Sequence, residues 1–135
     1  MKSHYRAVVI GGGVVGASTL YHLAKMGWND VVLVEKIEYT SGSTWHAAGL
    51  LPLFNMSYSV GKIHKYSVDL YQSLEEETGQ HVSFHKTGNL RLARNQERMD
   101  EYKRYCGTAS TIGVPFEMIG PAEIKKLWPF AKVDD

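Results

Sequence analysis

Two short apolar runs flank an amphipathic stretch at the start of the chain. Residues 7–10 and 31–34 are runs of aliphatic, mostly β-branched residues, each long enough for one buried strand. Between them, residues 14–26 carry small and aliphatic side chains three or four positions apart, the spacing of a helix that packs on one face. Gly27 would end this helix in a left-handed conformation. The pattern predicts a β-α-β unit with parallel strands.

The remainder of the chain predicts mainly helices. Residues 40–56 follow no clear period and predict an ordered loop with at most a short helical turn. Apolar residues at helical spacing, with glycine or proline at the ends, predict three helices, at 58–78, 96–112 and 121–129. Two further segments read as short strands, 88–93 by its alternation and 116–119.

Composition and charge narrow the functional classes. The chain has 135 residues, enough for one domain, and its 44% hydrophobic and 21% charged residues are typical of a folded globular protein. A net charge of +1 argues against a nucleic-acid binder. Cys106 is the one cysteine, which excludes an intramolecular disulfide, and no metal site is expected.

Two further absences concern location. No apolar run is long enough to span a membrane. The sequence has neither a secretory signal nor a transit peptide, so we expect a cytoplasmic protein, or one of the mitochondrial matrix if the chain is already processed.

A glycine-rich turn carries the first chemical signal. Gly11, Gly13 and Gly16 satisfy G-x-G-x-x-G, directly after the first predicted strand and at the start of the first predicted helix. The three glycines would allow a tight turn, close approach of the backbone to a pyrophosphate, and close helix–strand packing. Glu35, 19 residues after Gly16, could accept hydrogen bonds from an adenosine ribose. The turn predicts a dinucleotide site but does not choose between NAD and FAD.

The segment 41–50, Ser-Gly-Ser-Thr-Trp-His-Ala-Ala-Gly-Leu, favours FAD. It follows the second strand, so we expect it at the same rim as the glycine turn. Ser43 and Thr44 could hydrogen-bond phosphate, and the small residues after His46 would let a flat ring system approach the backbone. His46 itself has two interpretations: a hydrogen-bonded loop histidine, or a nucleophile that bonds a flavin.

The chain resembles the dimethylglycine and sarcosine dehydrogenase family, within the D-amino-acid-oxidase-like FAD flavoproteins. The resemblance rests on the glycine turn, the strand ending at Glu35 and Lys36, and the Trp-His segment, and continues through 74–80, 88–93 and 121–129. It implies covalent attachment of FAD to Nε2 of His46. It also implies FAD contacts from the following residues: Val14, Val15, Glu35, Lys36, Gly42, Ser43, Thr44, Trp45, Ala47, Ala48, Gly49 and Leu50.

The family resemblance also implies a reaction and partners. Family members oxidise an N-methyl group of a substituted glycine by hydride transfer to flavin N5, and the resulting iminium yields formaldehyde or is captured by tetrahydrofolate. Electrons then pass to an acceptor protein or to oxygen. Dimethylglycine is the favoured substrate and sarcosine the alternative; a non-catalytic nucleotide-binding or regulatory module stays open as a different class.

Family members are several times longer than this chain. We therefore expect residues 1–135 to be the N-terminal part of an FAD-binding domain, a Rossmann-like α/β unit whose third parallel strand, substrate domain and folate domain lie elsewhere. No catalytic residue is identified within the chain, and the isolated chain is expected not to turn over substrate.

Overall fold

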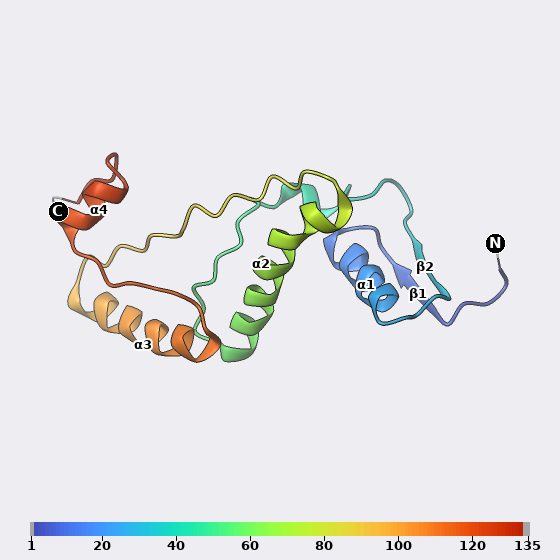
Figure 1. The fold of residues 1–135 in the computed structure, drawn as a ribbon, viewed down its shortest axis with the longest axis horizontal. Helices are drawn as coiled ribbons and strands as arrows, with labels where there is room; N and C mark the ends of the chain where they lie inside the picture. Colours follow the sequence, from blue (N-terminus) through green and yellow to red (C-terminus); the bar gives the residue numbers. More distant parts are fainter. Residues whose placement is uncertain (1, 134–135) are drawn as a thin grey trace. The chain divides into compact units, whose positions relative to one another are not determined.

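The computed structural model describes residues 2–133, and the chain divides into two compact units, Met1–Leu50 and Leu51–Asp135. The elements of the first unit are β1 (Ala7–Ile10), α1 (Val14–Lys25), β2 (Val31–Val34) and the 3-10 helix η1 (Ser43–His46) (Figure 1). Those of the second are α2 (Tyr58–Thr78), α3 (Gln96–Ile112) and α4 (Pro121–Leu127).

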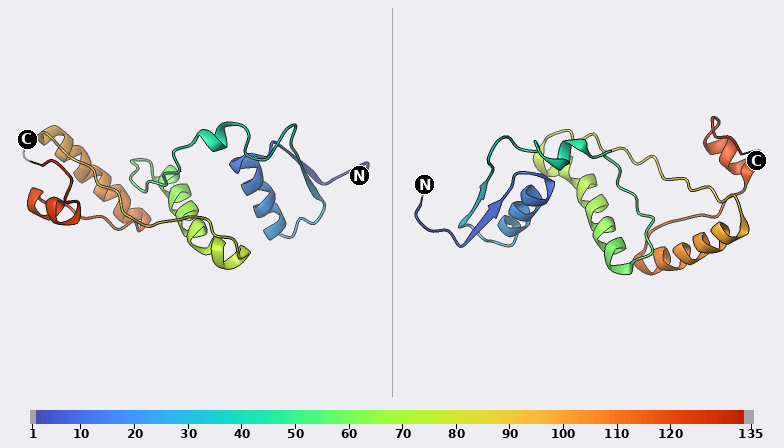
Figure 2. Two further views of the ribbon diagram at one scale, coloured as in Figure 1. Left: turned by 90° about the horizontal axis from the view of Figure 1, so that it is seen from above. Right: turned by 180° about the vertical axis from the view of Figure 1, so that it is seen from behind.

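The predicted β-α-β unit forms. β1 and β2 are parallel and pair in register from Ala7 with Val31 to Ile10 with Val34. Figures 1 and 2 show α1 alongside this pair of strands. Gly16 makes the close packing possible, because a Cβ at this position would lie 3.5 Å from Cγ1 of Val9 and would overlap the carbonyl oxygen of Gly11.

The end of α1 also follows the prediction. Gly27 has a φ of 82° and its N–H donates to the carbonyl of Ala24, while the N–H of Trp28 donates to the carbonyl of Leu23. These two bonds form the Schellman motif, in which a left-handed glycine satisfies the last carbonyls of a helix. The chain can then turn directly into β2.

Helices α2 and α3 meet in the second unit. Gly61 of α2 leaves room for the side chain of Ile112 at the end of α3. The buried apolar residues of the described chain all belong to this unit: Val68, Ala109, Val114 and Ile124. α2 and α3 end at Gly79 and Gly113, as predicted, and the φ angles of these glycines are left-handed, at 71° and 77°.

Both strands predicted in the second unit are wrong. Residues 88–93 and 116–119 run as irregular chain, and within the described residues 2–133 the sheet contains β1 and β2 alone. A strand needs a neighbour for its backbone N–H and C=O groups. Residues 88–93 are instead anchored through side chains: the hydroxyl of Tyr102 donates to the carbonyl of Leu92, and the guanidinium of Arg91 lies 5.0 Å from the ring centre of Phe54.

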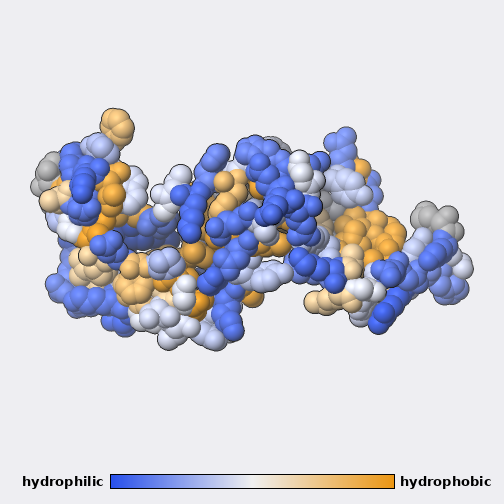
Figure 3. Space-filling model, viewed as in Figure 1, coloured by the Kyte–Doolittle hydropathy of each residue, from blue (hydrophilic) through white to orange (hydrophobic). Residues whose placement is uncertain are grey.

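One face of the two-stranded sheet is apolar and open. Residues that pair in register point to the same side, so Val8 and Ile10 share a face with Val32 and Val34. Val8 is 52% exposed, Ile10 86% and Val34 41%. Figure 3 shows apolar residues gathered on the visible surface of the first unit. Among the described helices, none is long and apolar enough to cross a membrane.

Candidate cofactor-binding site

The glycine turn sits between the end of β1 and the start of α1. Gly11 has a φ of 105°, which side-chain-bearing residues rarely adopt, and its N–H donates to the carbonyl of Val34 at 2.8 Å. Gly13 precedes α1 as its N-cap and offers no capping side chain. The first turn of α1 holds no acidic residue, so no carboxylate competes there for the N–H groups and the positive end of the helix dipole.

Glu35 reaches from the end of β2 to the glycine turn. Its Oε2 accepts a hydrogen bond from the N–H of Gly12 at 2.6 Å, and its Oε1 accepts from the N–H groups of Lys36 at 2.7 Å and Ile37 at 3.1 Å. The hydrogen bond from Gly12, followed by the bond from Ile37, holds the pKa of this carboxyl below its ordinary value. The group is therefore a fixed anion at neutral pH, and its half-buried position leaves it accessible to a ligand.

Thr44 joins the second predicted motif to the first. Its Oγ1 accepts a hydrogen bond from the N–H of Val14 at 3.0 Å, and a Cβ on Gly13 would lie 2.9 Å from the same oxygen. A hydroxyl can accept one bond and donate another. Thr44 can therefore cap α1 while its proton remains able to bond an anion at the helix N-terminus.

His46 ends η1 and is exposed. Its Nδ1 lies 3.1 Å from the carbonyl oxygen of Gly42. A carbonyl oxygen only accepts, so this contact is a hydrogen bond when Nδ1 carries the proton, which leaves the lone pair on Nε2. The ring lies against that of Trp45, with a centroid distance of 3.8 Å and an angle of 35° between the ring planes, and Nε1 of Trp45 donates to the carbonyl of Ser41. In this tautomer of the neutral ring, Nε2 is the nucleophilic nitrogen.

The other predicted site residues make fewer contacts with the glycine turn. Val14 and Val15 form the exposed first turn of α1, and Lys36 contributes the backbone bond to Glu35. Ser43 begins η1, and the N–H of Ala47 donates to the carbonyl of Thr44. Beyond η1, no hydrogen bond within the described residues joins the glycine turn to the last predicted members of the site, Ala48, Gly49 and Leu50.

Sequence analysis did not single out Gly12, which lies within the turn, or Tyr39 and Thr40, which contact Gly12. A Cβ on Gly12 would lie 2.5 Å from Cδ1 of Tyr39, and the N–H of Thr40 donates to the carbonyl of Gly12 at 3.0 Å. A third consecutive glycine, at a position that the G-x-G-x-x-G pattern leaves free, was the one available signal. Nothing in the sequence pointed to Tyr39 or Thr40.

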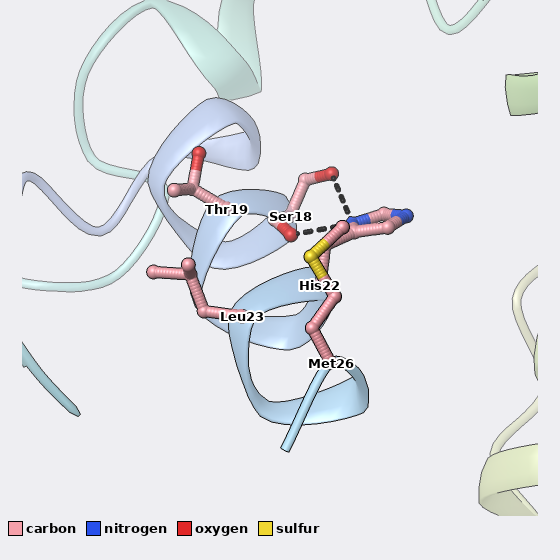
Figure 4. A pocket seen from close by; sticks show the side chains of 5 residues that line it. All are labelled: Ser18, Thr19, His22, Leu23 and Met26. Atoms are coloured by element: carbon pink, nitrogen blue, oxygen red, sulfur yellow. Dashed lines mark hydrogen bonds between the residues drawn. The ribbon is translucent and has the colours of Figure 1, made fainter. Parts of the chain in front are cut away.

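A shallow hollow of about 300 Å³ lies elsewhere, on α1. Figure 4 shows its lining, which comes from α1 and the C-cap residue Met26: Ser18, Thr19, His22, Leu23 and Met26. Nδ1 of His22 lies 2.6 Å from the carbonyl oxygen of Ser18, so the ring is already bonded to its own helix. The described residues hold no cluster of histidine, cysteine and carboxylate side chains fit for a metal ion.

The geometry of the turn fits a dinucleotide. Side chains at Gly12, Gly13 and Gly16 would collide with Tyr39, Thr44 and the backbone of Gly11 respectively. The glycines therefore leave the backbone at the start of α1 without side chains, which is the condition for close approach of a pyrophosphate. A carboxylate and a hydroxyl flank that position from β2 and η1.

Comparison with known proteins agrees with this geometry. A family described as "FAD dependent oxidoreductase" matches residues 6–135. "Dimethylglycine dehydrogenase, mitochondrial" of Rattus norvegicus is 48% identical over 133 residues, which cover 98% of this chain and 16% of the relative. "Sarcosine dehydrogenase, mitochondrial" of Homo sapiens is 43% identical over 136 residues, which cover 100% of this chain and 15% of the relative.

A solved structure shares the fold. The L-proline dehydrogenase from P. horikoshii superposes with a TM-score of 0.88 at 32% identity, and the match covers 98% of this chain and 35% of that chain. The predicted α/β class is confirmed. The chain spans about one-sixth of the length of the dimethylglycine and sarcosine dehydrogenases that it matches.

Proposed function

The chain belongs to the family of FAD-dependent oxidoreductases that includes the dimethylglycine and sarcosine dehydrogenases, and from this we propose that it forms the N-terminal, cofactor-holding part of an enzyme that oxidises an N-methylated amino acid. FAD, when bound, would accept a hydride from the substrate carbon next to nitrogen. The observation that carries the proposal is the convergence of the glycine turn, Glu35 and Thr44 at the start of α1.

The residues of the first unit would divide the work of holding the dinucleotide. Gly11, Gly13 and Gly16 keep the backbone bare at the start of α1, where N–H groups and the helix dipole favour the pyrophosphate. Glu35 uses three acceptor positions for backbone N–H groups and has capacity left for a ribose hydroxyl. Thr44 would donate its hydroxyl proton to a phosphate oxygen.

His46 is the residue that we propose holds FAD covalently, through Nε2. The bond of Nδ1 to the Gly42 carbonyl supports this choice of atom, because it keeps the proton away from Nε2. The ring of Trp45, tilted by 35° against the imidazole at a centroid distance of 3.8 Å, limits the rotation of the imidazole. A covalent bond would prevent loss of the cofactor and change its reduction potential.

The substrate class follows from the names of the relatives. Dimethylglycine is the first candidate and sarcosine the second, since relatives with these names are 48% and 43% identical to the chain. The electron acceptor, a protein or oxygen, and any use of tetrahydrofolate belong to the same proposal. A mitochondrial location is favoured by the names of both relatives, whereas the cytoplasmic location stays a prediction.

Anaerobic reduction of the purified, flavin-loaded whole protein tests the proposed function. Dimethylglycine should bleach the visible flavin absorption, and sarcosine should do so more slowly. Trimethylglycine is the matched control, because its quaternary nitrogen has no lone pair to stabilise the carbocation-like product. A faster reaction with sarcosine would make sarcosine, and not dimethylglycine, the first candidate substrate. A flavin that neither amine reduces would overturn the proposed activity and favour the non-catalytic alternative.

A further inference from the structure

Gly12 is a glycine that the dinucleotide pattern does not require. The pattern uses Gly11, Gly13 and Gly16 and leaves position 12 free. Gly12 is also absent from the glycines with positive φ, so its backbone conformation is open to other residues. The reason for glycine is steric, because a Cβ would lie 2.5 Å from Cδ1 and 3.1 Å from Cε1 of Tyr39, and 3.2 Å from Cβ of Glu35. The shortest of these contacts is with Tyr39.

Tyr39 does not belong to a hydrophobic core. It is 70% exposed, yet one edge of its ring lies against Gly12, which is buried. The contact uses the ring carbons Cδ1 and Cε1, so it does not depend on the hydroxyl. An exposed tyrosine held against one glycine of a cofactor turn calls for a reason other than hydrophobic burial.

The residue after Tyr39 fixes the same glycine. The N–H of Thr40 donates to the carbonyl of Gly12 at 3.0 Å, and Thr40 adopts a φ of 65°, which is rare for a β-branched residue. The N–H of Gly12 donates to Glu35. Gly12 is therefore held at its N–H by Glu35, at its carbonyl by Thr40 and at its Cα by Tyr39.

We propose that Tyr39 is a positioning residue for the cofactor site: its ring holds Gly12, and through the Gly12 N–H the Glu35 carboxylate, in the arrangement that receives the adenosine ribose of FAD. The inference rests on the proposed function. Because the carboxylate is already oriented, less ordering is needed when the nucleotide binds, and affinity rises accordingly. Thr40 also begins the segment that leads to Thr44, whose Oγ1 bonds the first turn of α1. The contact of Tyr39 with Gly12 therefore also positions the segment 41–50 relative to the glycine turn.

A double-substitution cycle between Gly12→Ala and Tyr39→Ala tests this role in the whole protein. A His46→Ala background removes the proposed covalent bond, so that the FAD dissociation constant can be titrated by flavin fluorescence. We expect Gly12→Ala to weaken FAD binding about tenfold or more when Tyr39 is present, and at least about threefold less than that when Tyr39→Ala has removed the shortest contact and left the one with Cβ of Glu35. Tyr39→Phe should keep the affinity, because it retains the ring carbons.

Tyr58→Ala is the matched control, since Tyr58 is 51% exposed and belongs to the second unit. It should leave the FAD dissociation constant unchanged, and circular dichroism should show that every variant is folded at the titration temperature. If Gly12→Ala weakens binding equally in both backgrounds, or Tyr39→Ala leaves binding unchanged, the role of Tyr39 is overturned while the proposed function stands. A protein that binds no FAD in any form overturns both.

Discussion

At the scale of single residues, the structure shows that Gly16 and Gly107 have different steric surroundings. A methyl group on Gly16 would overlap the carbonyl oxygen of Gly11. Gly107 is an exposed residue of α3 without a positive φ, and a Cβ added there would meet no other atom within 4 Å. The dinucleotide pattern predicted the first role from the sequence, and nothing in the sequence distinguished the second.

Gly16→Ala and Gly107→Ala should therefore change stability in opposite directions. We expect Gly16→Ala to cost about 1–3 kcal/mol of unfolding free energy through overpacking. Gly107→Ala should stabilise the protein by about 0.5–1 kcal/mol, because alanine is the better helix former. Urea unfolding of the two variants measures both effects. A Gly16→Ala protein as stable as the unsubstituted one would contradict the packing of α1 on β1.

The Glu35 carboxylate gives a prediction in pH. Hydrogen bonds lower its pKa in the folded protein, so between that pKa and about 4.3 the unfolded chain binds more protons than the folded one. Stability from Glu35 is thus complete above this window and is lost as the pH falls through it. Thermal unfolding from pH 7 to pH 3 should show an acid-side loss that is smaller in Glu35→Gln. The lowered pKa values of Asp30 and Asp100 are common to both proteins and cancel in the comparison.

Glu35→Gln also tests the cofactor site at neutral pH. An amide has one acceptor oxygen, so it cannot accept from both the Gly12 N–H and the N–H groups of Lys36 and Ile37. We expect FAD binding to weaken by at least about tenfold. An unchanged dissociation constant would show that the carboxylate does not take part in binding.

At the scale of elements, helices and the parallel strand pair were predictable, and the two remaining strands were not. Helix ends are local signals: Gly27, Gly79 and Gly113 terminate helices because of their own backbone freedom. A strand depends on a partner elsewhere in the chain. Residues 88–93 alternate correctly but find no such partner among the described residues, and Leu92 is bonded through the Tyr102 hydroxyl instead.

The N-cap of α3 gives the test at this scale. Oδ1 of Asn95 accepts a hydrogen bond from the N–H of Arg98 at 2.9 Å. Asn95→Ala should cost about 1 kcal/mol of unfolding free energy, because the first turn of α3 loses this acceptor. Asn95→Asp is the matched control and should be close to neutral, since it keeps an oxygen at the same place. Equal stability of Asn95→Ala and the unsubstituted protein would argue that the cap is not formed in solution.

At the scale of the whole molecule, the proposed cofactor site lies beside a two-stranded sheet that has one open apolar face. The open face of β1 and β2 exposes Val8, Ile10 and Val34. Contiguous exposed apolar surface is typical of interaction surfaces. The two-stranded sheet was predictable, because each strand is a short apolar run of its own. No substrate-binding residue was predicted, because no sequence motif in these 135 residues pointed to one.

We therefore expect the isolated 135-residue chain to be inactive towards dimethylglycine. The measurement is reduction of an electron-accepting dye, with and without the amine, alongside the whole protein as the active control. The isolated chain should give the same rate in both conditions. Amine-dependent reduction of the dye by the isolated chain would contradict the prediction that residues 1–135 alone do not oxidise the amine.

The most direct test of the central claim is the mass of the whole protein under denaturing conditions, followed by a peptide map. Our account predicts a protein heavier by one FAD, with the flavin on the peptide that contains His46, and a His46→Ala protein that releases all its flavin on denaturation. His64→Ala, in which a histidine bonded to the Pro52 carbonyl is replaced, should keep the covalent flavin. A denatured protein without FAD, or with the flavin on another residue, would contradict the account.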